Sequence, residues 1–211
     1  MKTRLALPTL LLCAVALLAA ALAPAQTAGK GKKKKMTPAP RDYANTLATL
    51  QTDMGDVTIK FFYDKAPNHV KNFVDLAAAG FYDGTLFHRV IPGFMIQGGD
   101  PLTKKAEDPR QPYGTGGNGN NTINAEFNDV SHKRGIVSMA RSSNPNSASS
   151  QFFIVVKDST FLDNQYSAFG EVVSGLDVAD KIAATPRSAN DRPNTPIRIK
   201  KILLTQAKSL S

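Results

Sequence analysis

The segment Phe87–Asp100, FHRVIPGFMIQGGD, places an arginine among apolar residues that otherwise have the pattern of strand core. Strict alternation along a β-strand puts Phe87, Arg89 and Ile91 on one face of the first apolar run. Burying an arginine costs free energy unless a partner satisfies its charge. The local pattern leaves two interpretations open. Either Arg89 reaches from a core strand to a carboxylate, or it is a cation held beside an apolar binding surface.

A proline–glycine pair interrupts this segment and starts a second apolar run. Alternation after the break puts Met95 and Gln97 on one face, opposite Phe94 and Ile96. Because the break shifts the register, the pattern does not decide whether Arg89 and Phe94 share a face.

Apolar periodicity predicts the secondary structure of the chain. A period of two between turn residues predicts short strands. The expected strands are Leu47–Gln51, Val57–Phe61, Phe87–Ile91, Phe94–Ile96, Gly135–Ala140, Phe152–Val156, Phe169–Val173 and Ile197–Leu204. A helical period predicts one helix that starts at Pro67 and stops at Gly80, and a second over Leu176–Ala183. Many short strands with two helices predict one mainly β domain, either a barrel or a sandwich.

The first 25 residues have the layout of a secretory signal peptide. A basic start, Met1–Arg4, precedes the apolar run Leu5–Ala23. We expect cleavage after Ala25 and export, with a retained membrane anchor as the alternative, since about 19 apolar residues nearly span a bilayer. The expected layout is a signal peptide at 1–25, a lysine-rich disordered linker at 26–42, a folded domain at 43–206 and a tail at 207–211.

The net charge of +9 comes mostly from the N-terminal part of the chain. Lys2 and Arg4 lie in the signal peptide and five more lysines lie in Lys30–Lys35, so the part from Met36 on carries about +2. A nearly neutral domain gives no case for nucleic-acid binding. The lysine run is interpreted as a solvated linker, or else as an electrostatic attachment to an anionic cell envelope.

Residues that could hold a metal or act as a thiol nucleophile are absent or scattered. Cys13 is the only cysteine, and it leaves with the signal peptide. The histidines, His69, His88 and His132, show no paired spacing, so no zinc site is predicted. We expect His69 to face solvent on its helix and His132 to lie in the polar turn SHKR. No metal and no cofactor are expected.

Two motifs lack the context that their chemistry requires. Gly114–Gly119, GTGGNG, matches a phosphate-binding fingerprint but has no strand before it and no helix after it, so we interpret it as a loop. The serine-rich stretch Ser142–Ser150 lacks the G-x-S-x-G elbow of a serine hydrolase. The acidic residues occur singly, so spacing gives no pair for acid–base catalysis.

Phe87–Asp100 resembles the signature of the cyclophilins, which are peptidyl-prolyl cis–trans isomerases. Further blocks resemble the same family in the same order, namely DKAPNHVKNFVDLAAAGFYDGTLFHRV, YGTGG, INAEF, GIVSMARSSNPNSASSQFFI and FLDNQYSAFGEVVSGLDVADKI. The resemblance covers Thr46 to Thr205. It implies a closed eight-stranded antiparallel β-barrel capped by two α-helices, and isomerase activity on X-Pro bonds.

The reaction of this family needs an apolar pocket and a fixed donor. Rotation about a peptide bond has a barrier of about 18–20 kcal/mol, because the C–N bond has partial double-bond character. As the bond twists, its nitrogen regains a lone pair and becomes a better acceptor. A guanidinium can donate to that nitrogen, or to the adjacent carbonyl, without any nucleophile or metal.

The resemblance assigns roles to individual residues. Arg89 takes the catalytic position. Gln97 takes the position that hydrogen-bonds the substrate backbone and helps to orient the arginine, and His88 takes that of a surface histidine without a catalytic role. Ala140 and Arg141 match the segment whose backbone pairs with an extended peptide. The walls and rim of the proline pocket are matched by Phe94, Met95, Phe153, Leu162 and Gln151.

Two residues depart from the eukaryotic pattern of this family, and one segment is extra sequence. Phe161 and Tyr166 stand where eukaryotic members carry Trp and His, and are similar to bacterial members at these substrate-site positions. Phenylalanine lacks the ring N–H of tryptophan, so weak cyclosporin binding is expected. The extra segment Thr103–Tyr113 is interpreted as a tolerated surface insertion, or else as a segment that tunes substrate choice.

The resemblance and the signal peptide together imply an exported, periplasmic monomer without stable membrane insertion after cleavage. An extracellular or membrane-anchored location is the alternative. The implied partners are proline-containing unfolded or partly folded polypeptides. In a second hypothesis the pocket captures proline segments as a binding module or chaperone, with incidental turnover. Arg89 argues against it, since capture needs only apolar walls.

Overall fold

The computed structural model describes residues 41–105 and 112–207. The expected signal peptide, nearly all of the expected linker and most of the expected tail lie outside these residues. In the part of the chain that the structure describes, every helix falls short of the length and apolar character that a membrane span requires.

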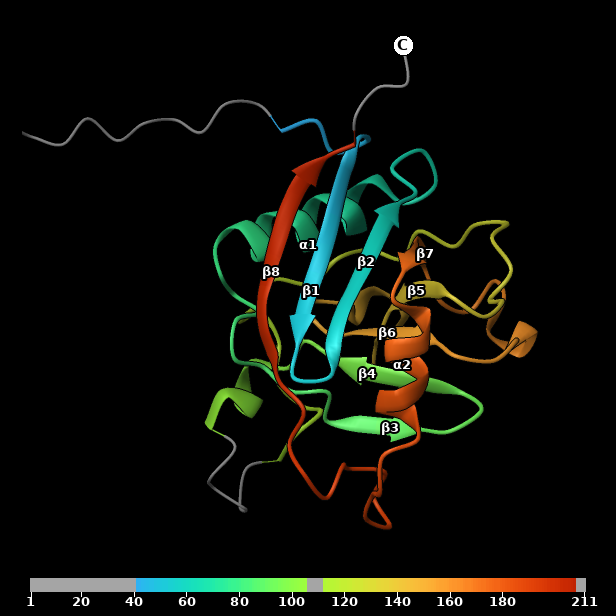
Figure 1. Ribbon diagram of the computed structural model, residues 1–211. Coiled ribbons are helices and arrows are strands. Elements are labelled where there is room, and N and C mark those ends of the chain that lie inside the picture. Colours follow the sequence, from blue (N-terminus) through green and yellow to red (C-terminus); the bar gives the residue numbers. More distant parts are fainter. Residues whose placement is uncertain (1–40, 106–111, 208–211) are drawn as a thin grey trace, which may run out of the picture. The chain divides into compact units, whose positions relative to one another are not determined.

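The described residues contain eight strands, two α-helices and three short 3-10 helices, and Figure 1 shows their arrangement. The strands are β1 (Thr46–Thr52), β2 (Gly55–Phe61), β3 (Arg89–Ile91), β4 (Met95–Gly98), β5 (Ile136–Met139), β6 (Phe152–Val155), β7 (Ala168–Ser174) and β8 (Ile199–Gln206). The helices are α1 (Pro67–Ala78), α2 (Leu176–Ala183), η1 (Pro101–Lys105), η2 (Pro145–Ser147) and η3 (Thr160–Leu162). Every predicted strand and helix is confirmed, and α2 has the predicted bounds.

All eight strands belong to one antiparallel sheet with the order β3-β4-β6-β5-β7-β2-β1-β8. β3 and β8 end this order, and the segments that precede them are joined by backbone hydrogen bonds. Phe87 N donates to Ile197 O (3.0 Å) and Ile199 N donates to Thr85 O (2.8 Å). Between these two bonds Leu86 and Arg198 form an isolated antiparallel bridge, and β8 itself begins at Ile199, two residues later than predicted. The predicted class, mainly β with eight antiparallel strands and two helices, is confirmed.

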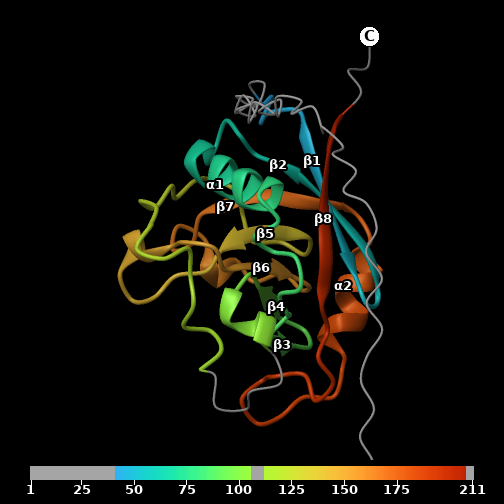
Figure 2. The ribbon, with the colours of Figure 1, turned by 90° about the vertical axis from the view of Figure 1, so that its left-hand side faces the viewer.

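The two helices pack against different strands. α1 contacts β7 and β8, whereas α2 contacts β2, β3 and β4 (Figures 1 and 2). Pro67 occupies the first turn of α1, where its missing N–H costs no hydrogen bond. The predicted apolar stripe of α1 is fully or almost fully buried in the main core, and its members are Val70, Phe73, Val74 and Ala77. Burial of this stripe fixes α1 to the sheet.

The segment Phe87–Asp100 contains the β3–β4 hairpin. Ile91 pairs with Met95 across a loop whose middle residue, Gly93, has a φ of +71°. Residues with a Cβ enter this left-handed region only at a cost in free energy. Arg89 lies directly opposite Gln97, and residues opposite each other in an antiparallel pair project to the same face.

The two faces of this hairpin have different surroundings. Val90 and Ile96 are fully buried in the main core. Alternation sends Arg89, Met95 and Gln97 to the opposite face of the sheet. The arginine is therefore kept out of the main core, and the hairpin presents it on the outer face.

Candidate functional site

A second apolar cluster lies on this outer face, separate from the main core. Its buried members are Met95, Phe153, Val155 and Leu162. The alternation of β6 explains the separation, because Phe152 and Ile154 point into the main core while their neighbours point outward. A sheet with apolar side chains on both faces can carry a binding pocket without opening its core.

A pocket of about 130 Å³ opens on this cluster. Its lining residues are Arg89, Phe94, Met95, Gln97, Ala140, Arg141, Phe153, Leu162 and Tyr166. All nine were predicted from the sequence as site residues. Phe94 lies in the loop between β3 and β4 rather than in a strand, so alternation does not constrain it. Phe94 and Arg89 thus line the same pocket, which local alternation left open.

η3 places two neighbouring side chains at different depths. Leu162 is buried in the pocket cluster, whereas Phe161 is 64% exposed. The ring centroid of Phe161 lies 5.5 Å from that of Phe94, a pocket-lining residue. Phe161 is therefore a rim residue that contacts the pocket wall.

Arg89 combines the two roles that the sequence left open. It lines the pocket, and its Nε lies 3.5 Å from Oδ2 of Asp191. The side chain of Arg89 is 43% exposed. The arginine thus reaches a carboxylate partner while its guanidinium stays accessible at the edge of the pocket.

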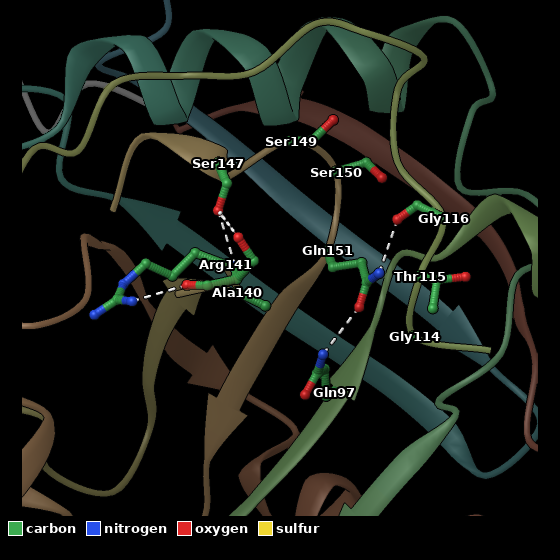
Figure 3. Close-up of a pocket in the computed structure, with 11 residues that line it drawn as sticks. Gln97, Gly114, Thr115, Gly116, Ala140, Arg141, Ser147, Ser149, Ser150 and Gln151 are labelled. Atoms are coloured by element: carbon green, nitrogen blue, oxygen red, sulfur yellow. Dashed lines mark hydrogen bonds between the residues drawn. The ribbon is translucent and has the colours of Figure 1, made fainter. Parts of the chain in front are cut away.

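A second pocket, of about 390 Å³, adjoins the first, and Figure 3 shows residues that line it. Gln97, Ala140 and Arg141 line both pockets. The other lining residues are Gly114, Thr115, Gly116, Ser142, Ser147, Ser149, Ser150 and Gln151. The Gly-rich stretch and the serine-rich stretch, for which local motifs predicted no chemistry, therefore form walls of this pocket.

Two glutamines join the pockets by a hydrogen-bond chain (Figure 3). Gln97 Nε2 donates to Gln151 Oε1 (2.9 Å), and Gln151 Nε2 donates to Gly116 O (2.8 Å). Gln151, predicted as a rim residue, thus belongs to the second pocket. The chain fixes the amide of Gln97 next to its strand partner, Arg89.

Arg141 is held over an aromatic ring between the pockets. Its Cζ lies 4.7 Å from the ring centroid of Tyr166. Its Nε donates to Gln165 O (3.0 Å) and its Nη1 donates to Ser142 O (2.8 Å). These contacts fix the chain segment that is expected to pair with a peptide.

His88 is not the surface residue that we expected. It is 6% exposed, and a Cβ at Gly114 would lie 3.8 Å from its ring, so the Gly-rich loop covers it. Burial lowers the pKa of His88, while the charge of Asp100 opposes this shift. Among the described residues, neither ring nitrogen has a hydrogen-bond partner. The expectation was wrong because the loop that covers His88 lies 26 positions away in the chain, where a local sequence pattern gives no information about it.

His69 does not face solvent either, and that expectation is also wrong. Its side chain is fully buried, and its Nδ1 lies 2.7 Å from Oε2 of Glu126. Glu126 also accepts from the backbone N–H groups of Asn68 (3.1 Å) and His69 (3.0 Å), which are among the unpaired donors that open α1. Burial lowers the pKa of His69 despite the carboxylate. Burial raises the pKa of Glu126, but its hydrogen bonds outweigh this effect and lower the pKa overall.

The buried side chain of His132 lies in a Ser–His–Asp chain that the polar turn SHKR did not indicate. Its Nδ1 lies 2.9 Å from Asp163 Oδ1, and its Nε2 lies 2.8 Å from Ser138 Oγ. This order is that of a hydrolase triad. Ser138, however, is fully buried beside its strand partner Phe153, so no substrate reaches its oxygen. The ring of His132 stacks on Phe153 (centroids 6.3 Å apart), so the chain supports the pocket wall.

Because His69 and His88 are buried, we expect the protein to lose stability in mild acid. Both His69 and His88 have a pKa below the ordinary 6.5, so the unfolded chain binds protons first as the pH falls. Their contribution is complete above about pH 7 and is lost as the pH falls from 6.5 through the lower folded-state pKa, at up to about 1.4 kcal/mol per pH unit for each histidine. Urea unfolding between pH 8 and pH 5 measures this slope. His69→Gln and His88→Gln should each flatten it, and slopes equal to that of the wild type would contradict the prediction.

Among the described residues, no group of three or more His, Cys, Asp or Glu side chains is arranged to hold a metal ion. The first pocket is lined instead by apolar walls, an amide, a phenol and two guanidinium groups. Such a set can bind an apolar ring and donate hydrogen bonds to the atoms beside it.

A comparison with protein-family models identifies the family of this chain. The model of the family described as cyclophilin type peptidyl-prolyl cis-trans isomerase/CLD matches residues 47–203. The chain belongs to this cyclophilin family. Its fold and its enzyme class, peptidyl-prolyl cis–trans isomerase, are therefore those that the sequence resemblance implied.

Individual cyclophilins support the assignment along most of their length. A peptidyl-prolyl cis-trans isomerase of Acinetobacter baylyi is 41% identical over 174 residues, which cover 80% of this chain and 88% of that protein. A probable isomerase of Brucella abortus is 44% identical over 162 residues, which cover 75% and 81%. A Cryptosporidium parvum cyclophilin, whose crystal structure was determined in the presence of the dipeptide Ala-Pro, is 32% identical in sequence to this chain. The two structures match with a TM-score of 0.67, over 76% of this chain and 99% of that chain.

Proposed function

We propose that Arg89 and the first pocket catalyse rotation about X-Pro bonds in extended polypeptides. Proline makes both isomers of the preceding bond accessible, yet their spontaneous exchange takes tens to hundreds of seconds. The apolar walls hold the proline ring, and Arg89 donates to the amide as it twists. No bond is broken, so the reaction requires only binding, orientation and a donor.

The position of Arg89 at the edge of an apolar pocket carries this proposal. A guanidinium stays charged and presents its N–H donors in a rigid fork. A twisted amide nitrogen is a better acceptor than a planar one, so the hydrogen bond strengthens on the way to the transition state. Only an interaction that strengthens in this way accelerates the reaction.

Proline-containing unfolded or partly folded polypeptides are the proposed substrates. The two pockets share Gln97, Ala140 and Arg141, so one extended chain can place a proline in the first pocket and a nearby side chain in the second. The Cryptosporidium parvum cyclophilin was crystallised in the presence of Ala-Pro, which supports recognition of a proline and the residue before it. The exposed ring of Phe161 lacks an N–H donor, so weak cyclosporin binding remains our expectation.

Export to the periplasm is the proposed location, with the protein acting there as a monomer. The support is the sequence of the first 25 residues, a basic start followed by an apolar run and small residues. N-terminal sequencing of the mature protein should give Gln26 as the first residue. A mature chain that starts at Met1 would instead support the membrane-anchor alternative.

A protease-coupled assay on short X-Pro peptides tests the proposed activity. Chymotrypsin cleaves the trans peptide after its reporter residue, so the slow phase reports cis-to-trans exchange. We expect the rate of this phase to rise in proportion to protein concentration, because each active site converts free substrate independently. A rate that stays at the spontaneous value at every protein concentration would refute the isomerase proposal and leave proline capture as the function of the pocket.

A further inference from the structure

The loop that follows α2 brings a carboxylate to the catalytic arginine. Its residues Arg187–Pro193 form a tight turn whose two ends pair in an isolated bridge. Within the turn, Asp191 N donates to Ser188 O (3.0 Å). The turn is therefore held by its own backbone, which sets the position of the Asp191 side chain.

Asp191 is also bonded to the strand that carries Arg89. Its backbone oxygen accepts from Val90 N (2.8 Å), and Val90 is the next residue after Arg89 in β3. Asp191 has a φ of +61°, in the left-handed region that Asp enters more readily than most residues. The backbone that positions this carboxylate is thus fixed directly to the backbone that positions the arginine.

The same turn also makes a cation–π contact. The Cζ of Arg192, the residue after Asp191, lies 3.9 Å from the ring centroid of Tyr113. Tyr113 precedes the Gly-rich loop that lines the second pocket. The turn therefore has two attachments near the site, one on β3 and one beside the second pocket.

The carboxylate of Asp191 lies between two guanidinium groups. Its Oδ2 lies 3.5 Å from Arg89 Nε, and its Oδ1 accepts from Arg187 Nε at 3.1 Å. The side chain of Asp191 is 28% exposed, so water screens the pair only in part. Arg187 occupies one oxygen and keeps the other directed at Arg89.

The contact engages Arg89 through one edge of its guanidinium. The nearest approach to Asp191 is made by Nε. Arg89 also lines the first pocket. As far as the described residues 41–105 and 112–207 go, no hydrogen bond takes up its Nη groups, which leaves them able to donate to a substrate at the pocket edge. A carboxylate that paired with the Nη groups would compete with substrate, whereas a carboxylate beside Nε orients the side chain.

We propose that Asp191 is a positioning residue for the isomerase reaction, which holds Arg89 beside the pocket while leaving its Nη donors to the amide. This inference rests on the proposed role of Arg89. An arginine side chain has many rotamers, and Arg89 is nearly half-exposed, so without a partner it populates orientations that cannot reach the twisting bond. Fixing a reacting group in its productive geometry is a large source of rate enhancement.

Asp191→Asn tests the proposal, because asparagine keeps the size of the side chain and tolerates the same φ but removes the charge. We expect kcat on an uncharged X-Pro peptide to fall about tenfold or more, while the peptide Kd stays within about twofold. Asp191→Glu restores the charge and should recover part of kcat. Asp129→Asn is the matched control, since it removes a carboxylate that pairs with Lys65, and it should leave both constants unchanged.

A double-mutant cycle separates this inference from the proposed function. Asp191→Asn should change kcat no further once Arg89 is alanine. A wild-type kcat in Asp191→Asn would overturn the inference, and so would a raised kcat, which would show that Asp191 competes with substrate. If Arg89→Ala itself keeps its kcat, the proposed role of Arg89 fails instead.

A spectroscopic readout covers the case in which Asp191→Asn is less stable than the wild type. The NMR signal of the Arg89 Nε–H reports on the charged groups close to Nε in the folded protein. We expect this signal to shift in Asp191→Asn and to stay in place in Asp129→Asn. An unshifted signal in Asp191→Asn would overturn the proposal whatever the activity of the variant.

Discussion

Arg89→Ala is expected to lower kcat/KM on X-Pro peptides by about 10²–10³-fold, the usual effect of removing one donor from a preorganised site. The pocket walls remain in this variant, so the peptide Kd should change much less than kcat. Arg89→Lys keeps the charge but loses the rigid fork, and should recover only part of the activity. The protease-coupled assay measures the rate, and calorimetric titration measures the peptide Kd.

Arg134→Ala is the matched control for this prediction. Arg134 is an exposed arginine that forms an ion pair with Asp180 on α2, outside both pockets. Its loss should leave kcat/KM at the wild-type value. Equal losses in the two variants would show that net charge, rather than the position of Arg89, determines the rate.

Phe152→Ala should mainly lower stability and Phe153→Ala should mainly lower activity, although the two residues are adjacent in β6. Phe152 is fully buried in the main core, where its ring meets the rings of Phe73 (5.3 Å) and Tyr82 (5.7 Å) edge to face. We expect Phe152→Ala to cost about 3–5 kcal/mol of unfolding free energy through lost burial and an unfilled cavity. Urea unfolding measures this loss, and Phe152→Leu gives a milder variant in case the alanine variant does not fold.

Phe153→Ala removes a wall of the first pocket instead. The space it leaves opens onto solvent, so the cavity contribution to its destabilisation is smaller than that of Phe152→Ala. The lost apolar contact with proline should lower kcat/KM by about tenfold to a hundredfold. If the folded Phe152→Ala variant lost more kcat/KM than the Phe153→Ala variant, the assignment of the two faces of β6 would be wrong.

Local patterns in the sequence predicted the elements well because each element carries its own period. The helix Leu176–Ala183 was predicted with its observed bounds, and the strands expected at Leu47–Gln51 and Val57–Phe61 were found as β1 and β2. The bounds of β3 and β8 were less accurate. There, long-range backbone bonds between Thr85–Phe87 and Ile197–Ile199 decide where pairing begins, and a period cannot reveal them.

The pocket was predicted mainly through resemblance to a family rather than through local chemistry. Alternation alone could not place Phe94, because a loop residue follows no strand period. The family signature did place it, and the structure gathers it with Arg89 in one cavity. Local chemistry explained why such a pocket needs an arginine, which is a charged donor beside apolar walls.

Contacts between distant segments were missed. Three histidines were placed near solvent or in a polar turn, yet each is covered by a segment that is far away in the chain. Asp191 was likewise missed, since about 100 positions separate it from Arg89 and it lies in a polar loop in which the sequence analysis found no motif. The signal available was the arginine itself, whose charge required a carboxylate somewhere in the fold.

The exchange rate of a bound X-Pro peptide tests most directly whether Arg89 stabilises the twisted amide. NMR exchange spectroscopy at saturating enzyme measures this rate apart from binding. We predict that bound-state exchange is about 10²–10³-fold slower in Arg89→Ala than in the wild type, with a similar peptide Kd. Equal bound-state exchange rates, with the whole loss of activity explained by weaker binding, would contradict the account.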